Sequence, residues 1–415
     1  MPDIFVHIKN GDLLAVRRVV EESGTTFSIS AYSTIGLTPL GAAIYYGKTD
    51  IIKFLLEAGA DIKEGYKSQF CKDKDLFQLE NWPQISPAIH CAAASGATED
   101  ILRLLVDHGA DVNDSSARDY GAEVLPLYVA TGQATQALIN LGADVCQQNA
   151  IGFTPLVHAL AREDVNSVRL LIEHGADVHI ERTPKYKIRT NAPDNDDDSD
   201  IVGEELLVQG GSSPLIVASH QGRLRPSSFE MFGILAKAGV DMNKRYHLKD
   251  APSYFDGGFT LLSLICGSRT KTPRLRGQYA NNDRYGQKEL QAIKAIIEAG
   301  VDVNSPPVIH YVCDGVMPFT DFESRSEVLR MLVQAGARSN HSHSGSSAMN
   351  ASATTTLLKS FNKCSESEIQ FQTMAAILDK AGAQWSGMEN FDVATLPDCV
   401  RDKTADMKGH LEPNQ

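Results

Sequence analysis

Apolar residues occur along this chain in short groups with helical spacing, and a glycine closes most of these groups. The clearest copy is the stretch from Gly36 to Ile62. Thr38 and Pro39 predict the start of a first helix, because a hydroxyl can cap free backbone N–H groups and proline suits the first helical position. Gly47 predicts the turn that follows, since glycine adopts a left-handed backbone most easily.

A second helix is expected to begin near Asp50 and to end at Gly59. Its apolar face carries four residues at helical spacing, namely Ile51, Ile52, Leu55 and Leu56. Neither predicted helix is long enough to be stable alone, so each needs a neighbour that covers its apolar face.

That neighbour is expected to be another copy of the same unit. Similar segments read ILRLLVDHGADVN at 101–113, ALINLGADV at 137–145 and VRLLIEHGADV at 168–178. Their glycines, Gly109, Gly142 and Gly175, are spaced by 33 positions, a period typical of stacked helix–turn–helix repeats. Weaker copies occur at 234–243, 296–304, 329–337 and 376–383.

These features resemble the ankyrin repeat family, whose units have a TPL start, a glycine turn, a leucine-rich second helix and a GAD loop. The match is close at 38–61 and 154–177, and weaker copies extend it over roughly residues 1–387. The resemblance implies an all-α ankyrin-repeat solenoid of about nine helix–turn–helix repeats with long finger-loop insertions. Such an array grows by stacking, so it escapes the size limit of a single core.

Four segments are expected along the chain. They are N-terminal repeats 1–5 (residues 1–180), a polar and acidic insertion (181–211), degenerate repeats 6–9 with insertions (212–387) and a C-terminal tail (388–415). By resemblance, the insertions at 65–83, 181–211 and 245–257 enlarge the fingers between repeats. The fourth repeat (124–145) is about one turn short, and Glu163 stands where the fifth repeat should have its turn glycine.

The composition limits the classes of function. The chain has 415 residues and a formal net charge of −13, which disfavours nucleic acid and anionic membranes as partners. Its seven cysteines form no CxxC pair, as expected of free thiols in a reducing cytosol. Because no secretory pattern and no bilayer-spanning apolar run are visible, we expect a soluble cytoplasmic protein. We also expect it to be a monomer.

The resemblance also places candidate partner-binding residues on a concave face. In each repeat, the two residues before the turn glycine and the residue before the TPL start are expected to point into the groove. Tyr45 and Tyr46 are the strongest candidates, because tyrosine combines a large contact area with few rotamers and a polar tip. The other candidates are Trp82 in the first finger insertion, Ser95, Arg162, His220 and Gln221, with Leu37 and Phe153 before the helix starts.

An acidic run offers a different reading. Counting from Asp194, carboxylates fall at positions 1, 3, 5, 7 and 12, which is the ligand spacing of an EF-hand calcium loop. However, Ser199 stands where the sharp turn needs glycine, and no flanking helices are visible, so carboxylate-rich disorder is the simpler explanation. A calcium-responsive binding module at 194–205 is kept as an alternative.

The insertion at 268–288 is basic and could meet phosphate, RNA or an acidic protein surface, although a solvated loop explains it more simply. Among the specific options an acidic partner is favoured, because the rest of the molecule is negative.

One pair of residues suggests an enzyme. His90 beside Cys91 could suggest a thiol nucleophile with its base, but neighbouring helix residues point in different directions. By resemblance, His90 is a structural histidine bonded to backbone. An effector or enzyme site in the irregular 245–355 region is therefore only an alternative.

Asparagines occupy three of the predicted turns, at Asn113, Asn243 and Asn304. In the ankyrin family such asparagines can be hydroxylated, whereas turn chemistry alone predicts side chains that bond the backbone of their own turn. The sequence as a whole predicts a non-enzymatic scaffold, adaptor or inhibitor. It would bind another protein through the concave face and finger loops, and it requires no cofactor.

Overall fold

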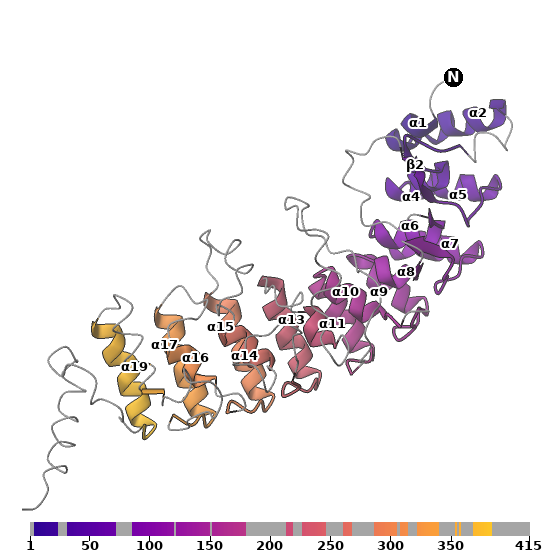
Figure 1. The fold of residues 1–415 in the computed structure, drawn as a ribbon. Coiled ribbons are helices and arrows are strands. Elements are labelled where there is room, and N and C mark those ends of the chain that lie inside the picture. The colour runs from indigo at the N-terminus through magenta and orange to yellow at the C-terminus, as the bar shows by residue number, and fades with distance from the viewer. Residues whose placement is uncertain are drawn as a thin grey trace, which may run out of the picture. The chain divides into compact units, whose positions relative to one another are not determined.

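A computed structural model describes residues 4–23, 31–71, 85–119, 122–149, 152–179, 213–218, 226–245, 260–267, 286–304, 308–313, 322–339, 353–354, 357 and 368–383. The chain divides into two compact units, Met1–Gly203 and Glu204–Gln415, called here the N-terminal and C-terminal units. Each unit is built from short helices that pack side by side (Figure 1).

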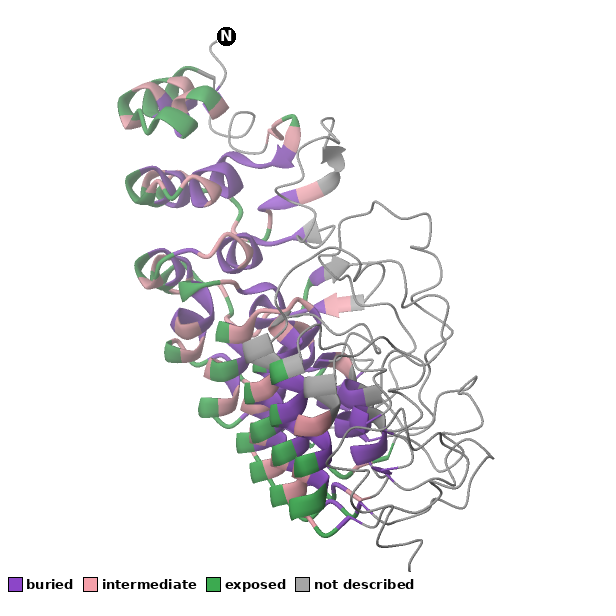
Figure 2. Cartoon of the chain, turned by 90° about the vertical axis from the view of Figure 1, so that its left-hand side faces the viewer, coloured by how far each residue is buried: buried purple, intermediate pink, exposed green. Residues whose placement is uncertain are grey.

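The described part of the N-terminal unit contains five helix pairs. They are α1 (Ile4–Asn10) with α2 (Leu13–Ser23), α4 (Pro39–Tyr45) with α5 (Thr49–Glu57), α6 (Ala88–Ala94) with α7 (Glu99–Asp107), α8 (Pro126–Val129) with α9 (Gln133–Asn140), and α10 (Pro155–Ala161) with α11 (Val165–Glu173). The first helices form a continuous row, because α1 packs on α4, α4 on α6, α6 on α8 and α8 on α10. Figure 2 shows this row as the most buried layer, with the exposed faces of the second helices on one side and short strands on the other.

The helix ends follow the predicted chemistry. Thr38 and Thr154 precede α4 and α10, and their hydroxyls accept hydrogen bonds from the backbone N–H groups of Gly41 (3.1 Å) and Val157 (3.3 Å). Gly47 has a φ of 65°, in the left-handed region that the turn requires. The predicted first helix, turn and second helix of this repeat are therefore confirmed.

The fourth pair is shortened, as the sequence predicts. Helix α8 has four residues, whereas α4, α6 and α10 have seven each. The chain then turns at Gly132, whose φ of 56° lies in the left-handed region, and enters α9 directly. One turn of helix is thus missing from the first-helix row at this repeat.

A five-stranded antiparallel sheet, which the sequence did not predict, lies beside the first helices. Its strands run in chain order, β1 (Ile35–Leu37), β2 (Tyr66–Cys71), β3 (Ile85–Ser86), β4 (Ala117–Asp119) and β5 (Ala122–Val124). Strands β2 and β3 belong to one finger and β4 and β5 to the next, so neighbouring fingers are joined edge to edge. The insertion predicted at 65–83 begins with β2, and its residues 72–84 lie outside the described part.

The C-terminal unit has helices of less regular length. They are α12 (Pro214–Ala218), α13 (Pro226–Lys237), α14 (Leu261–Gly267), α15 (Gly286–Glu298), α16 (Ile309–Cys313), α17 (Phe322–Gln334) and α19 (Glu368–Lys380). The second helices α13, α15, α17 and α19 pack in sequence, and α14 packs on α16. Across the described residues, no helix is both long and apolar enough to cross a membrane.

Asparagine side chains join successive turns in both units. Asn113 Oδ1 accepts from the backbone N–H of Asp144 at 2.9 Å, and Asn304 Oδ1 accepts from that of Arg338 at 2.7 Å. The bond within the turn is made instead by an aspartate, since Asp111 Oδ1 accepts from the N–H of Asn113. The expectation that these asparagine side chains bond their own turn is therefore wrong. Each side chain reaches the next repeat because its own turn already has a carboxylate acceptor.

Candidate protein-binding surface

The C-terminal ends of the first helices in the N-terminal unit carry partly exposed residues in four successive repeats. We call this set the inner surface and define it as Tyr45, Tyr46, Ala94, Ser95, Thr131 and Arg162. Of the nine residues predicted to contact a partner, it includes four, namely Tyr45, Tyr46, Ser95 and Arg162. Trp82, His220, Gln221 and the runs 194–205 and 268–285 lie outside the described residues, so those predictions stay untested.

Tyr45 and Tyr46 form an aromatic pair at the end of α4. Their ring centroids are 5.1 Å apart with an interplanar angle of 77°, an edge-to-face arrangement. Burial raises the pKa of the Tyr45 phenol, and the neighbouring Tyr46 phenol adds to that shift, so the hydroxyl stays protonated at neutral pH. Both side chains are only partly buried, so the pair offers aromatic area to a partner.

The middle of the inner surface consists of small residues held by backbone contacts. Ser95 follows α6, and its Oγ donates to the Ala92 carbonyl at 3.2 Å. Thr131 follows the short α8, and its Oγ1 donates to the Ala94 carbonyl at 3.2 Å. The Thr131 hydroxyl joins the fourth repeat to the third, whereas the Ser95 hydroxyl bonds within its own helix. Ser95 therefore offers a partner little beyond its small exposed surface.

Arg162 caps the last of these first helices. Its guanidinium Nη2 donates to the Ala130 carbonyl, at the end of the shortened α8. The missing helical turn leaves that carbonyl without a continuing helix, and the arginine of the following repeat supplies the donor. Burial lowers the pKa of Arg162, while the charge of Asp164 opposes that shift.

A histidine lies one helical turn before Arg162. The His158 ring stacks on Tyr128, with centroids 4.3 Å apart, and meets Phe153 edge-on at 5.4 Å. Its Nε2 is buried without a hydrogen bond. Burial lowers the pKa of His158 to about 3, helped by the charge of Arg162, so the ring is neutral at physiological pH.

Glu163, which follows Arg162, has a φ of 62° and is the only non-glycine residue with positive φ in the described part of the chain. A side chain in this region costs roughly 1–2 kcal/mol relative to glycine. The expectation that this position is a turn position without its glycine is confirmed. The strained turn therefore directly follows Arg162.

Two residues expected in the groove are elsewhere. Leu37 and Phe153, before the helix starts, are exposed by 0% and 4%. The prediction that they face a partner is wrong. Each closes a short turn instead, where the backbone N–H of Leu37 donates to Ser33 Oγ and that of Phe153 to Asn149 Oδ1, both at 3.0 Å.

His90 and Cys91 do not form a catalytic pair. His90 Nε2 bonds to the Val124 carbonyl at 2.9 Å, whereas the Cys91 Sγ faces the Ser86 carbonyl at 3.7 Å. Burial raises the pKa of the Cys91 thiol far above its usual range and lowers the pKa of His90 to about 4. The structural role predicted for His90 is confirmed. Within the described residues, no group of three or more His, Cys, Asp or Glu side chains could hold a metal ion.

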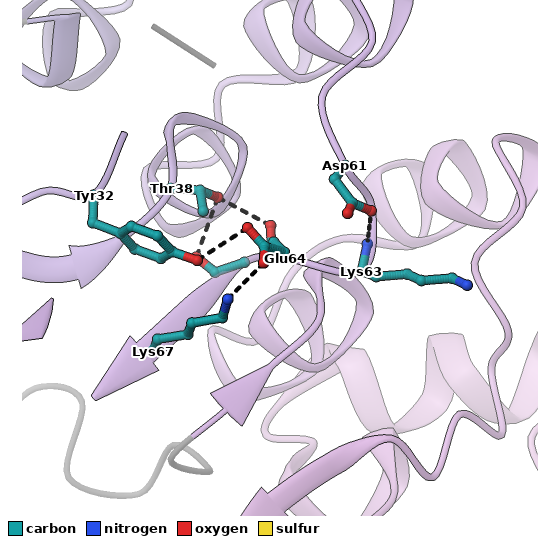
Figure 3. A network of polar contacts seen from close by, with 7 residues as sticks. Tyr32, Thr38, Asp61, Lys63, Glu64 and Lys67 are labelled. Carbon is teal, nitrogen blue, oxygen red and sulfur yellow. Dashed lines mark hydrogen bonds and ion pairs between the residues drawn. The ribbon is translucent and has the colours of Figure 1, made fainter. Parts of the chain in front are cut away.

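A polar network at the base of the first finger was not predicted from the sequence. The Glu64 carboxylate accepts from the Tyr32 hydroxyl at 3.0 Å and forms an ion pair with Lys67 (Figure 3). The Lys67 ammonium also lies 5.5 Å from the Tyr32 ring centroid. The hydrogen bond from Lys67 lowers the pKa of Glu64, and burial raises that of Tyr32. These contacts tie the segment before β1 to the start of β2.

A second arginine with a role like that of Arg162 was also missed. In the C-terminal unit, Arg325 is buried and donates from Nε to the Val312 carbonyl at 2.8 Å and from Nη2 to the Cys313 carbonyl at 3.1 Å. It thereby caps α16, a first helix of only five residues. Neither contact could be predicted from the sequence, where only the shortened first helices point to an incomplete helix end.

Comparison with known proteins agrees with the repeated helix pairs. Residues 35–64 match the family model for the ankyrin repeat, and residues 89–182 match the model for three copies of ankyrin repeats. Human ankyrin repeat and SOCS box protein 6 is 41% identical over 102 residues, covering 22% of this chain and 23% of that protein. The mouse B-cell lymphoma 3 protein homolog is 28% identical over 155 residues, covering 36% of this chain and 31% of that protein.

The matched region therefore spans less than a third of each of these relatives. Among solved structures, the ankyrin repeat domain of Bcl-3 has a TM-score of 0.40 and 22% identity, covering 64% of this chain and 93% of that chain. The human ASB11 ankyrin repeat domain has a TM-score of 0.42 and 16% identity, covering 71% and 97%. Both scores are low, so the assignment rests on the family models and on the repeated helix pairs. The chain is an ankyrin repeat protein with an all-α solenoid fold.

Proposed function

We propose that this chain is a scaffold or adaptor that binds another protein through its inner surface and the adjoining fingers. Ankyrin repeats generally mediate protein–protein interaction, and that general role supports the proposal. The more specific role, with a defined partner docked on the first-helix ends, is ours. In this proposal the protein is not an enzyme, needs no cofactor and acts in the cytoplasm as a monomer.

The observation that carries the proposal is the Tyr45–Tyr46 pair. Aromatic residues dominate binding energy at protein interfaces, because they bury a large area at a small entropic cost. Here two of them stand at one helix end, edge to face and partly exposed, next to a neighbouring repeat whose corresponding residues, Ala94 and Ser95, are small. Small neighbours leave the tyrosines as the prominent side chains for a partner to pack against.

The test compares partners of the wild-type chain with those of a Tyr45→Ala/Tyr46→Ala variant. The matched control is Lys53→Ala/Glu57→Ala, which removes two side chains from α5 in the same repeat. Candidates captured by the wild type would be purified and titrated calorimetrically against all three proteins. We expect the tyrosine variant to bind at least about 10-fold more weakly and the control to bind like the wild type. Equal binding by all three proteins would move the interface away from the inner surface.

A further inference from the structure

Arg162 places a cation on the inner surface that forms no ion pair with a described carboxylate. Its Nη2 donates to the Ala130 carbonyl, and its Nε is buried without a hydrogen bond. The residue is partly exposed, and the remaining nitrogen, Nη1, has no hydrogen bond to a described residue and is not fully buried. A guanidinium has five donors in a fixed plane, and most of them are unused here.

The nearest acidic residue of known geometry is already engaged. Both oxygens of Asp164 accept bonds from Ser167, Oδ1 from the backbone N–H at 3.1 Å and Oδ2 from the hydroxyl at 2.7 Å. Asp164 thereby caps α11, and its carboxylate is not within ion-pair distance of the guanidinium. His158, one turn earlier, is neutral and cannot compensate the charge of Arg162.

The guanidinium is largely desolvated, it is hydrogen-bonded to a carbonyl, and the charge of Asp164 acts on it without forming an ion pair. Such a cation is stabilised when an anion comes into direct contact with it. The geometry also selects the kind of anion. Glu163 and Asp164 place two acidic groups directly after Arg162, so a doubly charged phosphate would meet more repulsion than a singly charged carboxylate. A carboxylate also matches the planar fork of a guanidinium.

We infer that the Arg162 guanidinium receives a carboxylate side chain, an aspartate or glutamate, from the protein that docks on the inner surface. This inference rests on the proposed function and adds the chemistry of one contact to it. The partner segment then carries an acidic residue over the fourth and fifth repeats and apolar or aromatic residues for Tyr45 and Tyr46. Arg162 acts as an anchor whose orientation is fixed by the Ala130 carbonyl before the partner binds.

The test uses a phage library of random peptides selected against the full chain, followed by binding measurements on the selected peptides. We expect a fixed Asp or Glu in the peptides that bind the wild type. Changing that residue to its amide should weaken binding to the wild type by about 10-fold and leave binding to an Arg162→Met variant unchanged within about 2-fold. Arg162→Met keeps an apolar side chain, and thermal unfolding checks that the variant is folded.

Charge reversal separates a direct contact from a structural effect. An Arg162→Glu variant should bind the peptide with Lys at the acidic position more tightly than the original peptide. Swapping the two charges restores attraction only if residue 162 and the peptide residue are in direct contact. The inference is wrong if the selected peptides share no acidic residue, or if changing that residue weakens binding to Arg162→Met as much as binding to the wild type. In that case the proposed function still stands, provided that peptide binding requires Tyr45 and Tyr46. Failure to select peptides, or peptides that bind the Tyr45→Ala/Tyr46→Ala variant equally well, would overturn both. If inorganic phosphate competes better than acetate at equal ionic strength, the anion is not a carboxylate and the inference also falls.

Discussion

The carbonyl oxygen of Gly65 lies against Cα of Gly41, in the space where a side chain would begin. A Cβ atom at Gly41 would be well inside van der Waals contact with that oxygen, which is backbone and cannot rotate away. The same carbonyl accepts the N–H of Thr38 at 2.9 Å, so it is held in place by the helix cap. The second and third repeats approach each other this closely only because Gly41 is glycine.

Gly41→Ala should therefore destabilise the N-terminal unit by about 3 kcal/mol, near the upper end of the usual cost of overpacking. The measurement is urea unfolding followed by circular dichroism. The matched control is Gly233→Ala in α13, where a Cβ would meet only the Ala295 Cβ at 3.8 Å. That change should stabilise its helix by about 0.5–1 kcal/mol. A loss at Gly233 as large as that at Gly41 would show that helix geometry, not the Gly65 carbonyl, causes the effect.

Replacing Glu163 should relieve backbone strain. Glu163→Gly is expected to raise the free energy of unfolding by about 1 kcal/mol, because its φ of 62° suits glycine. The opposite change, Gly175→Ala, places a side chain at a φ of 87° with nothing within 4 Å of the new Cβ, so only strain should act. It should cost about 1 kcal/mol. Changes of the same sign in both variants would mean that the Glu163 side chain stabilises the fold by more than its backbone costs.

The buried His158 should make the N-terminal unit sensitive to acid. Its pKa is about 3 in the folded state and about 6.5 when unfolded, so the unfolded chain binds more protons at any pH below about 6.5. Stability from this residue is present above that pH and is lost as the pH falls towards 3. Relative to a His158→Phe variant, the wild type should lose about 2 kcal/mol between pH 6.5 and 4.5.

Unfolding titrations of both proteins at pH 7.0, 6.5, 5.5 and 4.5 would check this, and the contribution of His90 cancels because both proteins retain it. At pH 7 the two stabilities should be similar, since phenylalanine can keep the stacking on Tyr128 and removes the unbonded Nε2. Parallel pH profiles for the wild type and His158→Phe would contradict the assignment of a buried, neutral imidazole.

The bond from Asn113 to the next turn should add stability between repeats. Asn113→Ala removes the 2.9 Å contact with the Asp144 N–H and is expected to cost about 1 kcal/mol. Cys146 holds the corresponding place one repeat later, where its thiol faces the Gly175 carbonyl at 3.5 Å. Cys146→Asn should therefore stabilise the junction by about 0.5 kcal/mol, because an amide is a stronger donor than a thiol. An Asn113→Ala variant as stable as the wild type, together with a Cys146→Asn variant no more stable than the wild type, would show that the asparagine contact contributes nothing between repeats.

Features set by a single repeat could be predicted from the sequence. The caps at Thr38 and Thr154, the short α8 and the strained turn at Glu163 all follow from local turn and helix chemistry. On the inner surface, the same reasoning placed Tyr45 and Tyr46 at a helix end, where the structure has them partly exposed.

Features set by two repeats could not be predicted in this way. The contact of Arg162 with Ala130 joins residues 32 positions apart, and the burial of Leu37 and Phe153 depends on turns closed by Ser33 and Asn149. The five-stranded sheet likewise needs neighbouring fingers in register. The spacing of apolar residues indicates which side chains face the next repeat. It does not indicate which backbone groups of that repeat they meet.

The sheet also ends in a defined way. On its last strand, β5, the Glu123 carbonyl accepts the Asn149 side-chain amide at 3.0 Å, and that amide comes from the turn that leads into the following repeat. An uncovered strand edge is a template on which extended segments of other molecules assemble into aggregates. The Glu123 carbonyl is already hydrogen-bonded within the same chain. This contact therefore hinders the addition of a strand from another molecule at this edge of the sheet.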